Sequence, residues 1–129
     1  MSFSNDAEAK VLNHVFGIAT YTQPTLYLGV STADPTETGS GLAEPAGNAY
    51  ARVTTASTDW QLTGSTIDNQ NELAFPEATG SWGTLTHFAL FDALTGGNIV
   101  AYGSLTASKA IAANETLRFP AGNLTFTLD

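Results

Sequence analysis

Residues 80–98, GSWGTLTHFALFDALTGGN, decide the fold of this chain. Between positions 84 and 92 apolar residues occupy both odd and even positions, so both faces of a strand would be apolar. The glycine pair at 96–97 then tolerates the positive φ that a turn back into the next strand requires. The stretch predicts a hairpin over 84–106. Its first strand is expected to be central in a sheet, or to have its second face covered by a partner subunit.

Ser81, His87 and Asp92 lie close together in this stretch and suggest a serine-hydrolase triad. Five residue steps along an extended strand span ~16 Å and place His87 and Asp92 on opposite faces. A local triad is therefore excluded, and His87 is interpreted as a packed strand residue. We expect no catalytic residue, and the chain is predicted not to be an enzyme.

The chain around the hairpin is rich in short β-prone runs separated by Gly, Pro, Asn, Ser and Asp. They predict a mainly β fold, a single antiparallel β-sandwich or jelly-roll-like domain over 1–129, with one short helix before it. A helical segment at 1–20 precedes a β body at 24–129, in which 32–48 is a long loop with two prolines and three glycines. The predicted strands are 25–31, 49–55, 60–68, 71–75, 84–92, 98–106, 115–119 and 123–128.

A helix is predicted over 5–16, where Asn5 is the expected N-cap and Gly17 the stop signal. Apolar side chains at helical spacing form one stripe that needs a cover, either the rest of the chain or a neighbour. This stripe consists of Val11, Leu12, Val15 and Phe16.

Charge and composition exclude several classes of function. Four Lys or Arg residues face twelve carboxylates, giving a net charge of −8, and no basic patch is present for nucleic acid. The sequence has no cysteine, no apolar run of membrane-spanning length and no recognisable leader peptide. We expect a soluble protein made in the cytosol, without nucleic-acid or membrane partners.

No cofactor or metal is expected. Asp34, Glu37 and Glu44 fall in one loop, but their spacing matches no calcium-binding pattern. His14 is isolated from any acidic pair, and no phosphate-binding glycine motif with a lysine occurs.

The aromatic residues allow two interpretations. Flat rings can form a platform for sugars, whereas in small β proteins they more often pack in the core or at an interface. We favour packing for this set, which comprises Tyr50, Trp60, Trp82 and Tyr102.

Three stretches resemble a known family: LYLGVSTADPTETGSGLAEPAGNAYARV (26–53), FPEATGSWGTLTHFALFDALTGGN (75–98) and FPAGNLTFTLD (119–129). The resemblance is to small virion structural proteins of tailed bacteriophages, often labelled phage tail fibre protein. It covers nearly the whole chain and implies a component of the virion without enzymatic activity.

Two positions on the virion are compatible with this resemblance. A fibre normally needs a long shaft, for which 129 residues with one short helix leave little room, so the sequence favours a capsid decoration (cement) protein. Such a protein would stabilise the head as a symmetric oligomer, expected here to be a homotrimer that contacts the major capsid protein. The alternative is a tail fibre or host-adhesion protein that contacts tail proteins and binds glycans through Trp60 or Trp82.

Either position requires contact surfaces. We predict that they include the helical stripe and apolar residues of the central stretch. The candidate interface residues are Val11, Leu12, Val15, Phe16, Trp82, Phe88 and Leu90.

Overall fold

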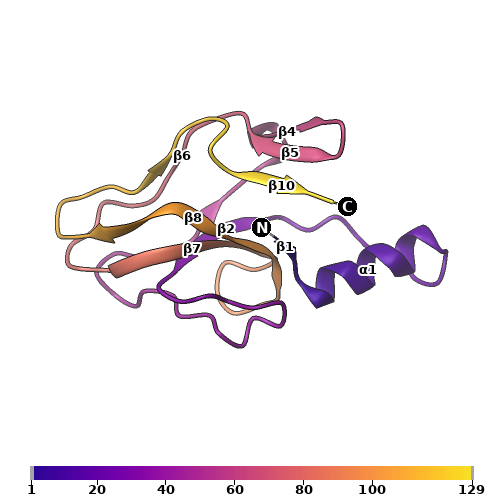
Figure 1. Cartoon of the computed structure of the whole chain (residues 1–129), viewed down its shortest axis with the longest axis horizontal. Helices are drawn as coiled ribbons and strands as arrows, with labels where there is room; N and C mark the ends of the chain where they lie inside the picture. Colours follow the sequence, from indigo (N-terminus) through magenta and orange to yellow (C-terminus); the bar gives the residue numbers. More distant parts are fainter. Residues whose placement is uncertain (1, 129) are drawn as a thin grey trace.

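The predicted hairpin is the centre of the structure. The computed structural model describes residues 2–128, in which β7 (Gly83–Phe91) and β8 (Ile99–Ile111) pair antiparallel along most of their length (Figure 1). Strand β8 continues beyond the predicted end at 106, because Leu85 and Thr84 still pair with Lys109 and Ala110. The hairpin is thus confirmed.

Three further strands complete the sheet around this hairpin. Strand β2 (Tyr27–Ser31) pairs with β7, and β3 (Val53–Thr54) pairs with β2. Strand β1 (Ser2–Phe3) pairs with β8 on the other side, so the antiparallel order is β1-β8-β7-β2-β3. Strand β7 is therefore an interior strand, as its two apolar faces predicted.

A second layer packs on one face of this sheet. It contains the three-stranded sheet β10-β5-β4 and the pair β6-β9. Aromatic rings fill the space between the layers: the Phe88 ring lies 5.5 Å from that of Phe126 and 6.5 Å from that of Phe119, both edge to face. The sandwich-like fold is confirmed. The strands of the second layer are β4 (Trp60–Thr63), β5 (Thr66–Asn69), β6 (Leu73–Ala74), β9 (Arg118–Phe119) and β10 (Thr125–Thr127).

The other face of the hairpin is covered by the loop at 32–48. Ala89, Phe91 and Ile99 form a separate buried cluster on this face, against which Leu42 of the loop packs. The loop is fastened at its base, where the Thr32 N–H donates to the Ala43 carbonyl at 3.0 Å. The chain thus covers both faces of β7 by itself.

The helix α1 (Asn5–Val15) begins and ends almost where predicted, but Asn5 is not its cap. Ser4 is the N-cap: its buried Oγ accepts from the Ala7 N–H at 3.1 Å and donates to the Ile99 carbonyl at 2.5 Å. After Phe16 the chain reverses at Gly17, whose φ of +74° favours glycine. Only Ala7 of the helix is buried, and the helix projects from the β body (Figure 1).

Several predicted strands differ in the structure, among them 71–75 and 115–119, of which only the two-residue strands β6 and β9 form. Residues 60–68 form the hairpin β4-β5 and not one strand, because Gly64 adopts a φ of +62° and reverses the chain. Of 49–55 only Val53 and Thr54 are in a strand. The 3-10 turn η1 (Ser57–Asp59) then leads into β4.

The substitution Phe88→Ala tests the aromatic core. We expect it to lower the free energy of unfolding by about 3–5 kcal/mol, because it leaves a cavity where three rings meet. Urea unfolding followed by tryptophan fluorescence measures the change. The control Leu94→Ala removes a half-exposed side chain and should alter the value by less than ~0.5 kcal/mol. Equal effects of the two substitutions would contradict this packing.

Candidate functional site

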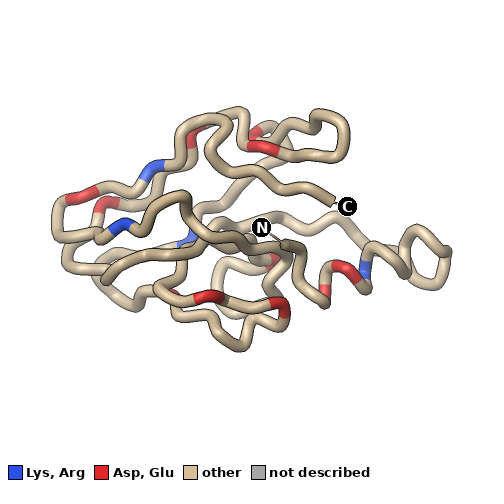
Figure 2. Tube along the Cα trace, in the orientation of Figure 1, with Lys and Arg blue, Asp and Glu red and all other residues tan. Residues whose placement is uncertain are grey.

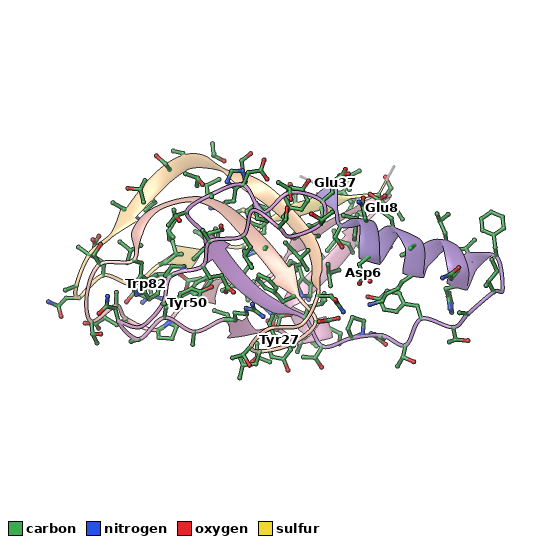
Figure 3. The ribbon with its side chains drawn as sticks, turned by 90° about the horizontal axis from the view of Figure 1, so that it is seen from below. Asp6, Glu8, Tyr27, Glu37, Tyr50 and Trp82 are labelled. Carbon is green, nitrogen blue, oxygen red and sulfur yellow. The ribbon has the colours of Figure 1, made fainter. Side chains whose placement is uncertain are left out.

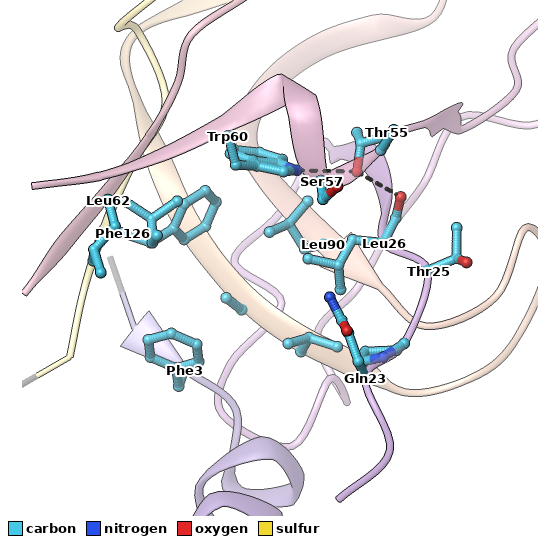
Figure 4. A pocket seen from close by; sticks show the side chains of 15 residues that line it. Phe3, Gln23, Thr25, Leu26, Thr55, Ser57, Trp60, Leu62, Leu90 and Phe126 are labelled. Carbon is cyan, nitrogen blue, oxygen red and sulfur yellow. Dashed lines mark hydrogen bonds between the residues drawn. The ribbon is translucent and has the colours of Figure 1, made fainter.

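A groove opens between the two layers of the sandwich. Its volume is about 630 Å³, and its lining comes from strands of both sheets and from the segment that precedes β2 (Figure 4). None of the lining residues carries a formal charge. The lining residues are Phe3, Gln23, Pro24, Thr25, Leu26, Thr55, Ala56, Ser57, Trp60, Leu62, Ile67, Leu90, Val100, Ala101 and Phe126.

The indole of Trp60 forms one wall of the groove and is held in place. Its Nε1–H donates to Thr55 Oγ1 at 3.1 Å, and that hydroxyl donates to the Leu26 carbonyl at 2.9 Å (Figure 4). The Phe126 ring packs against it edge to face at 5.8 Å. Since the polar atom of the indole already has its partner, the wall offers mainly carbon surface to a ligand. The groove is therefore suited to apolar groups.

A second apolar surface lies at the far end of the helix. We call it the helix end, and it consists of Leu12, Val15, Phe16 and Ile18, which are 58%, 68%, 73% and 76% exposed. Figure 2 shows that the charged residues of this arm lie in the first part of the helix and that its tip is uncharged. Exposed apolar residues so close together in the sequence make the helix end a candidate interaction surface.

The chain returns from the helix end along the helix itself. The Tyr21 N–H donates to His14 Nδ1 at 3.1 Å, and Lys10 lies 5.7 Å from the centre of the Tyr21 ring. Lys10 also pairs with Asp6 at 2.7 Å. The return segment covers this side of the helix and leaves the helix end open.

The predicted interface residues separate into two groups. Leu12, Val15 and Phe16 belong to the exposed helix end, and Val11 beside them is half-buried. The expectation for Trp82 and Phe88 in the second group is corrected, because their side chains are buried in the core of their own chain; Leu90, equally buried, is one of the residues that line the groove. This group consists of Trp82, Phe88 and Leu90, with exposed fractions of only 4%, 6% and 4%.

The aromatic residues do not form a common platform for sugars. Trp82 and Tyr50 pack edge to face at 5.3 Å inside the body, and the Trp82 Nε1–H donates to the Asn48 carbonyl at 2.9 Å (Figure 3). Tyr102 packs on the opposite face of the sheet with the cluster around Phe91. Trp60 is the member of the set that lines the groove.

His87, Asp92 and Ser81 make local structural contacts. His87 Nδ1 is 2.8 Å from Thr86 Oγ1, and Ser81 Oγ accepts from the Gly83 N–H at 3.1 Å. The Asp92 carboxylate accepts from the backbone and side-chain N–H groups of Asn98 at 2.7 and 3.1 Å, which closes the β7-β8 loop. Burial acts to raise the pKa of Asp92, but these hydrogen bonds outweigh it and lower the pKa.

The acidic residues of the 32–48 loop serve different contacts. Asp34 Oδ1 accepts from the Thr36 N–H at 2.9 Å, and the backbone carbonyl of Glu37 accepts from the Asn5 N–H at the start of the helix at 3.0 Å. Glu44 points to Arg52, and Figure 3 labels Glu37 beside the first part of the ribbon of α1. Within residues 2–128, His, Asp and Glu side chains form no group of three that would hold a metal ion.

The Glu44–Arg52 ion pair is a buried contact that the sequence did not reveal. Arg52 Nη2 lies 2.6 Å from Glu44 Oε1, and Nη1 donates to the carbonyls of Ala93 and Gly96 at 2.8 and 2.9 Å. The guanidinium also lies 3.5 Å from the centre of the Phe91 ring. These contacts join the 32–48 loop to the β7-β8 loop. Little in the sequence indicated this pair, because Arg52 is a single basic residue within the predicted strand 49–55.

Tyr50 completes this buried network. Its hydroxyl donates to Glu44 Oε2 at 2.6 Å and accepts from the Val30 N–H at 3.1 Å. Burial, together with the hydrogen bond to Glu44, raises the pKa of Tyr50 well above its ordinary value. The phenol is therefore a fixed neutral donor between β2 and the 32–48 loop.

The described residues include no helix that is both long and apolar enough to cross a membrane.

Comparison with known proteins identifies the class. The groove, the helix end and the β body all fall within residues 2–127, which match the family model described as Podophage GP4 fiber I protein gp80. The chain belongs to this family. It is a bacteriophage virion structural protein of the fibre type, as the resemblance indicated. No curated protein is similar enough to this chain to count as a relative.

The substitution Arg52→Met tests whether the ion pair fastens the 32–48 loop. We expect it to lower the free energy of unfolding by about 3 kcal/mol, because the largely buried Glu44 carboxylate loses its ionic partner and keeps only the hydrogen bond from Tyr50. The matched control is Glu72→Gln, which breaks the exposed pair with Arg118 and should cost less than ~1 kcal/mol. Urea unfolding measures both. An Arg52→Met variant as stable as the control would show that the pair does not fasten the loop.

Proposed function

We propose that the chain is a tail-associated fibre protein of the virion. The observation that carries the proposal is the family match over residues 2–127, whose description names a fibre protein. Capsid decoration, which the sequence favoured, has no support of this kind and becomes the alternative outcome of the test.

Two parts of the structure would have different roles in such a fibre component, the β body as a rigid support and the apolar surfaces as contact sites. The β body is stiffened by the central hairpin, with a covered face on each side. The projecting helix and the groove are the two apolar surfaces through which the body would contact other virion proteins. We further propose that the chain acts by binding and not by catalysis, since Ser81, His87 and Asp92 are occupied by structural hydrogen bonds.

Labelling of virions tests the position. Gold-labelled antibody raised against the purified protein should bind at the tail of intact particles and be lost from particles stripped of their tails. Antibody against the major capsid protein is the control and should label heads in both samples.

A protein gel of purified virions measures the copy number independently. A tail position predicts tens of copies per particle, because tail structures repeat few times compared with the capsid shell. Label spread over heads, together with hundreds of copies, would contradict the proposal and restore capsid decoration.

A further inference from the structure

We propose that copies of this chain associate by seating the helix end of one copy in the apolar groove of another. The helix end is the set Leu12, Val15, Phe16 and Ile18, and the groove is the cavity walled by Trp60 and Phe126. This inference goes beyond the position in the tail and depends only on the geometry of the chain.

The helix is incompletely stabilised by its own chain. An isolated helix of its 11 residues is marginal in water, and helices in proteins gain most of their stability by packing an apolar face. In this chain Ala7 is the buried residue of the helix, while Val15 and Phe16 are more than two-thirds exposed. The helix end therefore needs a cover from outside its own body.

The groove has the chemistry to provide that cover. Its volume of about 630 Å³ is within the range of sites that enclose a ligand, and its lining carries no formal charge. Leu62 stands at its edge with 67% of its surface exposed, so the groove also presents an apolar rim. Phe16 offers an aromatic ring, and Val15 and Ile18 offer aliphatic side chains beside it. These groups match the apolar character of the groove walls.

Electrostatics favours contact at these two surfaces over the rest of the molecule. Each copy carries a net charge of −8, so copies repel one another at most orientations. No Asp, Glu, Lys or Arg occurs from Val11 to Ala33, a run that contains the helix end and one edge of the groove. Figure 2 shows this uncharged run from the helix tip back to the body. Two copies can meet here without burying an unpaired carboxylate.

The path of the chain separates the helix end from the groove, so that the helix end of one copy can enter the groove of another. The arm leaves the body directly after Phe3 and rejoins it at Gln23, and both residues line the groove (Figure 4). The helix projects outward between these points (Figure 1), and none of the residues from Ser4 to Thr22 lines the groove of its own copy. Each copy then gives one helix end and receives one, which permits a closed ring such as the homotrimer expected from the sequence.

Light scattering of the purified chain tests association directly. The native chain should have a mass that is a multiple of 13.5 kDa, and Phe16→Lys should raise the dissociation constant about 30-fold or more. Lysine lowers the net negative charge, so a loss of association cannot come from added repulsion. The matched control Leu94→Lys changes an exposed leucine on the β7-β8 loop and should leave the mass unchanged.

Mixing of two variants tests that the helix end meets the groove. Leu62→Lys should weaken association as Phe16→Lys does, because it places a charge at the groove edge while the helix end stays native. Since Phe16→Lys keeps an intact groove and Leu62→Lys keeps an intact helix end, an equimolar mixture should form a one-to-one complex.

Three results would overturn the proposal. A native chain of 13.5 kDa at all concentrations would show that another protein covers the helix end. Association that survives Leu62→Lys but not Phe16→Lys would show that helix ends pack on each other. Failure of the two variants to combine would exclude contact between the helix end and the groove. None of these results bears on whether the protein lies in the tail.

Discussion

The pairing of β7 with β8 is the constraint on which the rest of the structure depends. Side chains alternate across the hairpin, so Phe88 and Leu90 enter the core between the layers while Ala89 and Phe91 form a second cluster on the other face. A strand with two apolar faces must be covered twice. The second sheet and the 32–48 loop provide the two covers, and the Glu44–Arg52 pair fastens the loop in place.

The same constraint limits where the proposed contacts can form. Because β7 and β8 bury most of their apolar side chains within the chain, the two candidate contact surfaces lie where the layers separate and where the arm leaves the sheet. The groove lies at the first place and the helix end at the second. Both are uncharged in a strongly acidic chain, which makes them the surfaces at which association costs least in electrostatic repulsion.

The sequence predicted the elements better than their contacts. Alternation and glycine turns correctly indicated the hairpin, the sandwich-like fold, the helix and the long loop. The Gly64 reversal was missed because β4 and β5 are both β-prone and read as one strand. Apolar residues at Phe88 and Leu90 signalled a covered face, but periodicity does not say whether the cover is the chain itself or a partner. The groove was out of reach, since Phe3, Trp60 and Phe126 meet only in the folded chain.

Hydrogen exchange of the associated protein tests the central claim most directly. The claim is that the β7-β8 hairpin is stabilised within a single chain, whereas the helix of the arm is stabilised by packing against another copy. Amides of β7 and β8 should stay protected in the native protein and in Leu62→Lys, because their hydrogen bonds lie within one chain. Helical amides from Lys10 to Val15 should be protected in the native protein and exchange faster in Leu62→Lys, where the helix itself is unchanged. Equal protection of the helix in both proteins would contradict the account.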